Sequence, residues 1–223
     1  MSRTVLYTSS KFIRPIVPVC LVNHFKLNVN VVDIFTDKDK FKQEFPWAKL
    51  PSLVEYGSGY KLTESIAVSH YLTGLSENKS EIEKLLGASN DFKTQSQILR
   101  WESLAVSDFL TQQVNYIGPL VGIRPYETHA VEKARGNLDT LLSLYESRLN
   151  DNKYLVRSDG VTMGDLLSAA SFYFGFKTLY DAEWRSHHPG ITNWYNEVTQ
   201  TPYLESFFKD KSPVEKAILD RSH

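Results

Sequence analysis

The stretch FPWAKLPSLVEYGSGYKLTESIAVSHYL, from Phe45 to Leu72, decides the fold of the first part of the chain. Within it, Pro51 stands just before an apolar strand and Ser65 opens an apolar helix. A proline in this position is often held by a cis peptide bond, which turns the preceding backbone outward. Leu50 can then offer its N–H and C=O groups to an extended ligand, as a sheet edge does.

The start of the helix at Ser65 adds a site for negative charge. Backbone N–H groups in the first turn of a helix lack acceptors within the helix, and the positive end of the helix dipole favours a carboxylate there. Lys49 places a cation close by in the sequence. Each feature alone is more often structural, since most X-Pro bonds are trans and most serines at helix starts are caps. Their order and spacing together predict one site for an extended anionic ligand such as a tripeptide.

Strand and helix signals alternate along the first third of the chain. Short β-branched runs predict strands, apolar positions at helical spacing predict helices, and Gly57-Ser58-Gly59 is typical of a hairpin turn. The expected elements are a strand at 4–7, a helix at 15–25, a strand at 29–34, a helix at 38–45, a hairpin at 53–56 and 60–62, and a helix at 65–75. A βαβ unit followed by a ββα unit is the order of a thioredoxin-like domain.

The second half of the chain reads differently, because no convincing strand follows the polar segment 76–80. Apolar positions at helical spacing predict helices within 91–117, 126–149, 163–180 and 191–199. We therefore expect a thioredoxin-like domain over residues 1–77 and an all-helical domain over residues 89–223.

A variant capping box marks the start of one of these helices. Thr162 is followed three residues later by Asp165, and Val161 and Leu166 occupy the two staple positions. Such a pattern fixes where a helix begins inside a core. Loss of the threonine hydroxyl should cost about 1 kcal/mol or more.

Residues 45–72 resemble the glutathione-binding half of the cytosolic glutathione transferases, and the box and staple at 161–166 resemble the start of a buried helix in their helical domain. The resemblance implies that family's fold, an α/β thioredoxin-like domain followed by an all-α domain, and implies glutathione as the ligand. The binding residues carried over are Leu50 and Pro51 at the cysteinyl backbone, Glu64 and Ser65 at the γ-glutamyl end, and Lys49 near the glycine carboxylate.

Motifs in the helical half resemble one branch of this family. The runs SQILRW at 96–101 and EWRSHHP at 183–189, with Ser107-Asp108 and Trp194, are similar to the N-terminal region of the fungal gamma subunit of translation elongation factor 1B. That branch implies elongation-factor subunits as possible partners, and the family implies a homodimer. The chain ends at His223 without the Lys-rich linker and further domain of the gamma subunit, so we expect a short stand-alone relative. The aromatic residues of these motifs are expected in the core.

Glutathione transfer requires the thiol of the ligand as a thiolate, because the thiolate is the nucleophile. In the family, a Tyr, Ser or Cys between the first strand and the first helix stabilises this anion. Here Ser9 or Ser10 can donate a hydroxyl to sulfur, and Arg14 can supply positive potential, whereas Tyr7 is expected to pack in the strand. Ser10 and Arg14 are the catalytic candidates.

Three functions fit these observations to different degrees. The first is a glutathione transferase acting on small electrophiles, with the second substrate resting on Phe109, Gln113 and Tyr116. The second is a non-catalytic protein-interaction module related to the elongation-factor subunit. A glutathione-dependent thiol reductase is disfavoured, because no cysteine occupies the segment that would activate sulfur.

Composition excludes several other classes. A formal net charge of -1 without a long basic run argues against direct nucleic-acid binding, and six histidines without a ligand pattern give no support for a metal site. The single cysteine, Cys20, suits a reducing compartment and is expected to be buried and inert. The N-terminus lacks an apolar leader segment, and no apolar run approaches the ~18 residues of a membrane span. We therefore expect a cytoplasmic protein that does not enter a membrane.

Overall fold

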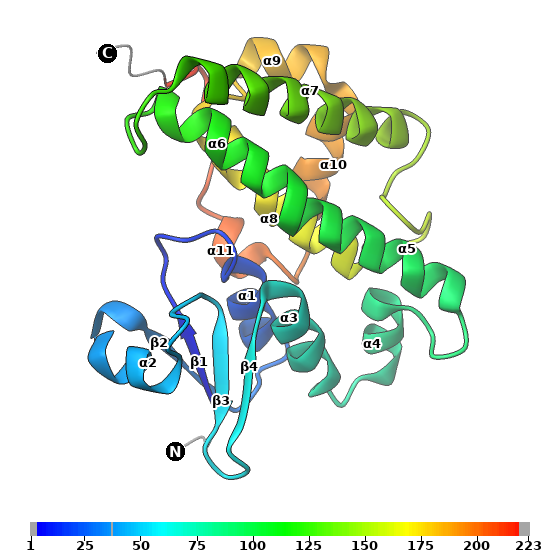
Figure 1. The fold of residues 1–223 in the computed structure, drawn as a ribbon. Coiled ribbons are helices and arrows are strands. Elements are labelled where there is room, and N and C mark those ends of the chain that lie inside the picture. Colours follow the sequence, from blue (N-terminus) through cyan, green and yellow to red (C-terminus); the bar gives the residue numbers. More distant parts are fainter. Residues whose placement is uncertain (1–3, 37, 219–223) are drawn as a thin grey trace.

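Four short strands form the sheet of the first half. The structure, a computed structural model, describes residues 4–36 and 38–218 (Figure 1). The strands are β1 (Thr4–Thr8), β2 (Val29–Asp33), β3 (Ser52–Glu55) and β4 (Tyr60–Thr63), in the order β2-β1-β3-β4. β1 runs parallel to β2 and antiparallel to β3, which pairs antiparallel with β4. This is the mixed sheet of a thioredoxin-like domain.

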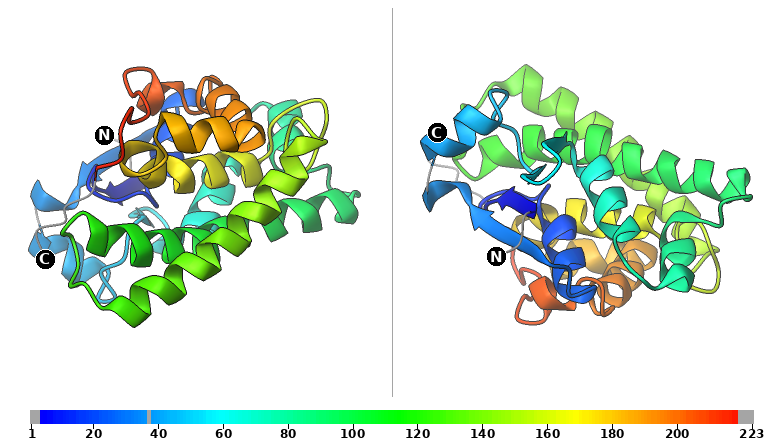
Figure 2. Two further views of the ribbon diagram at one scale, coloured as in Figure 1. Left: turned by 90° about the horizontal axis from the view of Figure 1, so that it is seen from above. Right: turned by 90° about the horizontal axis from the view of Figure 1, so that it is seen from below.

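Alternating side chains of the strands separate the two faces of this sheet. Leu6 and Leu53, paired across β1 and β3, belong to the large core that includes the residues of α1 (Ile16–His24) and α3 (Ser65–Gly74). Val5, Tyr7 and Val54 point to the opposite face and form a smaller core with α2 (Lys38–Glu44). The views in Figure 2 show the sheet between these helices.

The second half is helical throughout the part that the structure describes. Its largest feature is a long bent helix made of α5 (Phe92–Ser103), a π-helical turn (Leu104–Phe109) and α6 (Leu110–Leu120), drawn in green in Figure 1. The other helices are α4 (Lys79–Leu86), α7 (Thr128–Asn150), α8 (Met163–Thr178), α9 (Ala182–His187), α10 (Pro189–Thr199) and α11 (Glu205–Phe208). α8 lies at the centre and most of its residues are buried.

The fold class predicted from the sequence is confirmed, and the elements of the first half lie within a few residues of their expected bounds. Three short helices were not expected. α4 lies between the two predicted domains, while α9 coincides with most of the EWRSHHP motif and α11 follows the last predicted helix. Each has eight residues or fewer, too few for a clear helical period to emerge from the sequence.

The predicted capping box at the start of α8 is confirmed. Asp165 is fully buried, and its Oδ2 accepts hydrogen bonds from the Thr162 backbone N–H at 2.9 Å and from the Thr162 hydroxyl at 2.8 Å. Its Oδ1 accepts from the Leu155 N–H and from the Trp194 indole N–H, both at 2.9 Å. The carboxylate therefore joins α8 to the preceding loop and to α10 as well as capping its own helix.

A second polar cluster connects the two halves. The His24 ring nitrogens, at the end of α1, lie 3.2 Å from Glu81 Oε1 on α4 and 3.2 Å from the Pro202 carbonyl oxygen. Tyr203 donates its hydroxyl to the same Glu81 oxygen at 3.2 Å. With the shared apolar core beneath it, this cluster fixes the helical half against α1.

Candidate functional site

The peptide bond between Leu50 and Pro51 is cis, as the sequence predicted. Leu50 precedes β3, which begins at Ser52, and among the described residues its N–H and C=O take part in no backbone hydrogen bond. The backbone at Leu50 is thus available to an extended ligand, in the way that an unpaired strand edge is.

The helix α3 begins beside this edge with free backbone donors. Its N-cap residue is Glu64, and no side chain caps the first turn. Glu64 has φ +75°, in the left-handed region that a residue with a Cβ rarely adopts, and its carboxylate is exposed. Strained backbone of this kind costs on the order of 1–3 kcal/mol and is concentrated at functional sites.

Ser65 is the first residue of α3, as predicted, but its hydroxyl is already engaged. The side chain is buried, with 1% exposed, and the hydroxyl donates to the Arg14 carbonyl oxygen at 2.6 Å. The donor that Ser65 leaves for a carboxylate is therefore its backbone N–H rather than its hydroxyl.

Lys49 lies at the surface near Leu50. Its Nζ is 5.6 Å from the centroid of the Trp47 ring, and Trp47 is 74% exposed. A cation held over an exposed aromatic ring can still pair with an anion from the solvent side. Lys49 is thus placed to add positive charge next to the Leu50 backbone.

Arg14 and Ser10, the two catalytic candidates, have different surroundings. The Arg14 guanidinium donates to the Val106 carbonyl oxygen at 3.1 Å, in the π-helical turn of the second half. Ser10 is exposed at the start of the loop after β1, while its neighbour Ser9 is buried and accepts from the Lys11 N–H at 3.3 Å. Of the two serine hydroxyls, only that of Ser10 can reach a ligand in solvent.

Tyr7 packs in the strand, as expected. Its ring lies 5.3 Å from that of Phe41 and 5.9 Å from that of Phe45, and its hydroxyl is 3.1 Å from the Tyr56 hydroxyl. The side chain is buried under α2, on the face of the sheet away from α3. Tyr7 cannot donate to a sulfur atom beside Ser10.

A small cavity lies between the two halves. A cavity of about 10 Å³ remains, lined by Ile13, Arg14, Ser65, Val106, Leu110, Leu167, Ala170 and Ser171. Such a volume holds about one water molecule. This cavity is too small for a tripeptide, so a ligand at Leu50 and Glu64 does not extend into it.

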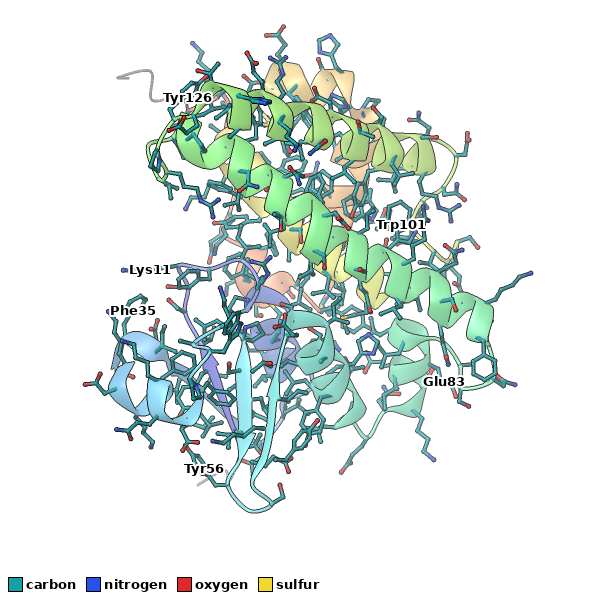
Figure 3. All side chains as sticks on the ribbon, in the orientation of Figure 1. Lys11, Phe35, Tyr56, Glu83, Trp101 and Tyr126 are labelled. Carbon is teal, nitrogen blue, oxygen red and sulfur yellow. The ribbon has the colours of Figure 1, made fainter. Side chains whose placement is uncertain are left out.

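Of the residues expected to support a second substrate, Phe109 and Gln113 are wrongly placed for that task, whereas Tyr116 is half-buried and stays a prediction. Phe109 and Gln113 are fully buried, and Gln113 holds the Tyr180 hydroxyl at 3.1 Å and the Gly175 N–H at 3.1 Å. The exposed apolar side chains near the β1–α1 loop are Phe12 and Phe35, and Figure 3 shows Phe35 next to Lys11. Gln113 was expected to line the site of the second substrate, but tertiary packing makes its amide part of the core.

The remaining sequence candidates are structural. Cys20 is buried, and this burial raises the pKa of its thiol to about 11, so it stays protonated and inert as expected. Trp101 and Trp194 are core residues, and Figure 3 shows Trp101 within the helical half. In the EWRSHHP motif, the Trp184 ring stacks on His188 at 4.1 Å. The bond from Arg14 to the Val106 carbonyl could not be predicted from the sequence, because every residue has a backbone carbonyl and the residue type does not mark this one.

Two further properties bear on function. Across residues 4–36 and 38–218, none of the helices has the length and apolar character needed to cross a membrane. In the same part of the chain, no cluster of three or more His, Cys, Asp or Glu side chains is arranged to hold a metal ion.

The geometry defines a class of protein: a thioredoxin-like domain with a cis-proline beside an open helix N-terminus, followed by an all-helical domain. Residues 4–74 match the model of the glutathione S-transferase N-terminal domain, and residues 109–202 match that of the C-terminal domain. A putative elongation factor 1 gamma homolog of Saccharomyces cerevisiae is 42% identical over 94% of each chain. The chain belongs to the glutathione transferase family.

Within this family the chain is similar to elongation factor 1-gamma proteins. Elongation factor 1-gamma 1 of Saccharomyces cerevisiae is 38% identical over 98% of this chain, which spans 52% of that protein. The crystal structure of the glutathione transferase-like domain of elongation factor 1-gamma from the same organism superposes with a TM-score of 0.89, at 38% identity and over 98% of both chains. The branch predicted from the helical motifs is thus confirmed.

Proposed function

We propose that the chain binds glutathione at the surface formed by Lys49, Leu50, Pro51, Glu64 and Ser65. The observation that carries the proposal is the strained backbone of Glu64 at the open end of α3, beside the cis peptide bond before Pro51. The free N–H groups of α3 would donate to the γ-glutamyl carboxylate, and the Leu50 backbone would pair with the cysteinyl residue. Lys49 would face the glycine carboxylate.

Two substitutions at Ser65 test which donor binds the ligand. We expect Ser65→Ala, which removes only the hydroxyl, to lower stability more than glutathione affinity, because the hydroxyl serves the Arg14 carbonyl. Ser65→Pro also removes the backbone N–H, in a first-turn position where proline is tolerated, and should weaken binding by about 1–3 kcal/mol. Calorimetry with glutathione measures both affinities, and circular dichroism checks the fold. Equal affinities in wild type and Ser65→Pro would contradict the site.

Conjugation of the bound thiol to a small electrophile is a finer proposal for the same site. Ser10 would donate its hydroxyl to the sulfur, and Arg14 would supply positive potential from the start of α1. The exposed rings of Phe12 and Phe35 offer apolar surface for the electrophile.

The charge of Arg14 makes this proposal testable. If it stabilises the thiolate, the bound glutathione thiol titrates below the value of about 8.5 typical of a free thiol. Arg14→Gln keeps an amide donor for the Val106 carbonyl and removes the charge, so it should lower turnover of an aryl halide more than it lowers binding. Thiolate absorbance against pH in wild type and Arg14→Gln measures the effect. If the pKa of the bound glutathione thiol is unshifted in both wild type and Arg14→Gln, the proposal of catalysis is contradicted and only that of binding stands.

A non-catalytic interaction module is the second candidate. The observations that favour it are the engagement of the Arg14 guanidinium by the Val106 carbonyl and the small volume of the cavity beside Arg14 and Ser65. The elongation factor 1-gamma relatives suggest subunits of a translation elongation complex as partners, in the cytoplasm. Co-purification of such subunits with the tagged chain, together with absent turnover, would support this candidate over the enzyme.

Under either candidate we propose a homodimer, with α3 and the long helix that starts at α5 at the interface. Phe92 and Leu99 on α5 are 74% and 51% exposed. Such an assembly would remove their apolar surface from water. Light scattering at micromolar concentration should report twice the chain mass of 25.5 kDa. A mass of one chain would contradict the dimer.

A further inference from the structure

A cavity of about 380 Å³ lies in the helical half, away from the candidate site. It is a hollow, open to solvent on one side, that is bordered by α8, α10, α11 and the segment that follows α11. Its lining residues are Tyr173, Phe176, Lys177, Tyr195, Asn196, Thr199, Gln200, Glu205, Phe208, Lys209, Lys211, Ser212 and Pro213. The volume falls within the range of ~300–1,000 Å³ that small-molecule sites occupy.

One side of this cavity is aromatic. The rings of Phe176 and Tyr195 are stacked at 3.7 Å with an interplanar angle of 8°. Tyr173 stands edge-to-face with Phe207 and Phe208, at 5.2 and 5.5 Å between ring centroids. Phe176 and Tyr195 are almost fully buried, whereas the Tyr173 ring is half-buried, so Tyr173 offers the cavity a rigid apolar surface for a planar group.

Two phenol hydroxyls are without partners at this surface. Within the described part of the chain, neither the Tyr173 nor the Tyr195 hydroxyl makes a hydrogen bond, although Tyr195 is only 5% exposed. Burial raises the pKa of both phenols, so each keeps its proton and remains a donor. Because these hydroxyls are unpaired but not fully buried, they can donate to an acceptor placed in the cavity.

The charge of the lining is positive. Three exposed lysines, Lys177, Lys209 and Lys211, and one exposed acidic residue, Glu205, line it, which leaves two positive charges in excess in a chain of net charge -1. The Lys211 ammonium donates to the Phe207 carbonyl oxygen at 2.6 Å and retains two further N–H donors. An excess of two charges matches a phosphate monoester, which carries about -1.5 to -2 at neutral pH.

We propose that this cavity binds a small aromatic phosphate monoester, with its ring against Tyr173, its polar atoms near the Tyr195 hydroxyl and its phosphate at the lysines. The cavity shares no lining residue with the surface of Leu50, Glu64 and Ser65. Its ligand therefore binds independently of glutathione, and the site exists whether or not the chain binds glutathione.

Three probes test the two halves of the ligand separately: 1-naphthyl phosphate, inorganic phosphate and 1-naphthol. Isothermal calorimetry should show 1-naphthyl phosphate binding about tenfold or more tightly than either fragment, because it alone joins ring and dianion. The affinity should be unchanged by saturating glutathione. Equal affinity of either fragment, or no binding of 1-naphthyl phosphate at millimolar concentration, would overturn the proposal.

Variants of the lining locate the site. Lys177→Gln and Lys211→Gln should each weaken 1-naphthyl phosphate binding several-fold to about tenfold, and Tyr195→Phe should weaken it through the lost hydroxyl. Lys93→Gln, at an exposed lysine of α5 outside the cavity, is the matched control and should bind as wild type does. Binding that responds equally to Lys93→Gln and Lys177→Gln would show non-specific attraction and overturn the assignment.

Discussion

Asp165→Ala is expected to lower the free energy of unfolding by about 4 kcal/mol or more. The substitution leaves the Thr162 N–H, the Leu155 N–H and the Trp194 indole N–H buried without an acceptor. Each unsatisfied buried donor costs about 1–3 kcal/mol. Urea unfolding followed by tryptophan fluorescence measures the loss, and the Trp194 indole reports the broken contact directly.

A graded series separates the cap from the wider network. Thr162→Ala removes one hydroxyl and should cost about 1 kcal/mol, and Asp165→Asn should fall between it and Asp165→Ala because the amide oxygen still accepts on one side. Asp159→Ala, at an exposed aspartate paired with Arg157 on the surface, is the control and should leave the transition unchanged. An Asp165→Ala loss no larger than that of Thr162→Ala would mean that the carboxylate only caps α8.

The sequence was sufficient for the parts of the molecule that local signals determine. The order of Pro51, the Gly57–Gly59 turn and Ser65 predicted the cis-proline edge, the hairpin and the helix start, because each depends on backbone chemistry within a few residues. The Thr162–Asp165 box is local in the same sense.

The sequence could not show contacts between distant segments. The Arg14 guanidinium meets a carbonyl 92 residues away, and the Ser65 hydroxyl meets a carbonyl 51 residues away. Both partners are backbone oxygens, so no side-chain pattern marks them. These two bonds change the chemistry expected at the site, since they engage groups that sequence reasoning left free for glutathione.

The misplacement of Gln113 has the same origin. An amide side chain on an otherwise apolar helix suggests a ligand-facing position, but here its oxygen accepts from the Gly175 N–H and its nitrogen donates to Tyr180, both inside the core. The partner that makes this burial possible is Gly175, because a side chain there would occupy the space of the Tyr180 ring. Gln113 on α6, Gly175 on α8 and Tyr180 in the loop between α8 and α9 thus pack together as one unit.

Gly175→Ala is therefore expected to destabilise the helical half by about 2–3 kcal/mol, the cost of overpacking a core. The added Cβ would lie 2.5 Å from Cδ2 of Tyr180 and closer still to Cε2, and the buried ring has no free space into which to turn. Its displacement would break the bond to Gln113 and leave that amide unsatisfied.

Gly136→Ala is the matched control for this change. Gly136 lies on the exposed face of α7, where an added Cβ meets no atom within 4 Å, so alanine there should stabilise the protein by about 0.5–1 kcal/mol through helix propensity. If urea unfolding shows a lower free energy of unfolding for Gly175→Ala and a higher one for Gly136→Ala, packing against Tyr180 is the cause of the loss. Stabilisation by Gly175→Ala as well would show that the Tyr180 ring moves freely and that Gln113 is not locked in the core.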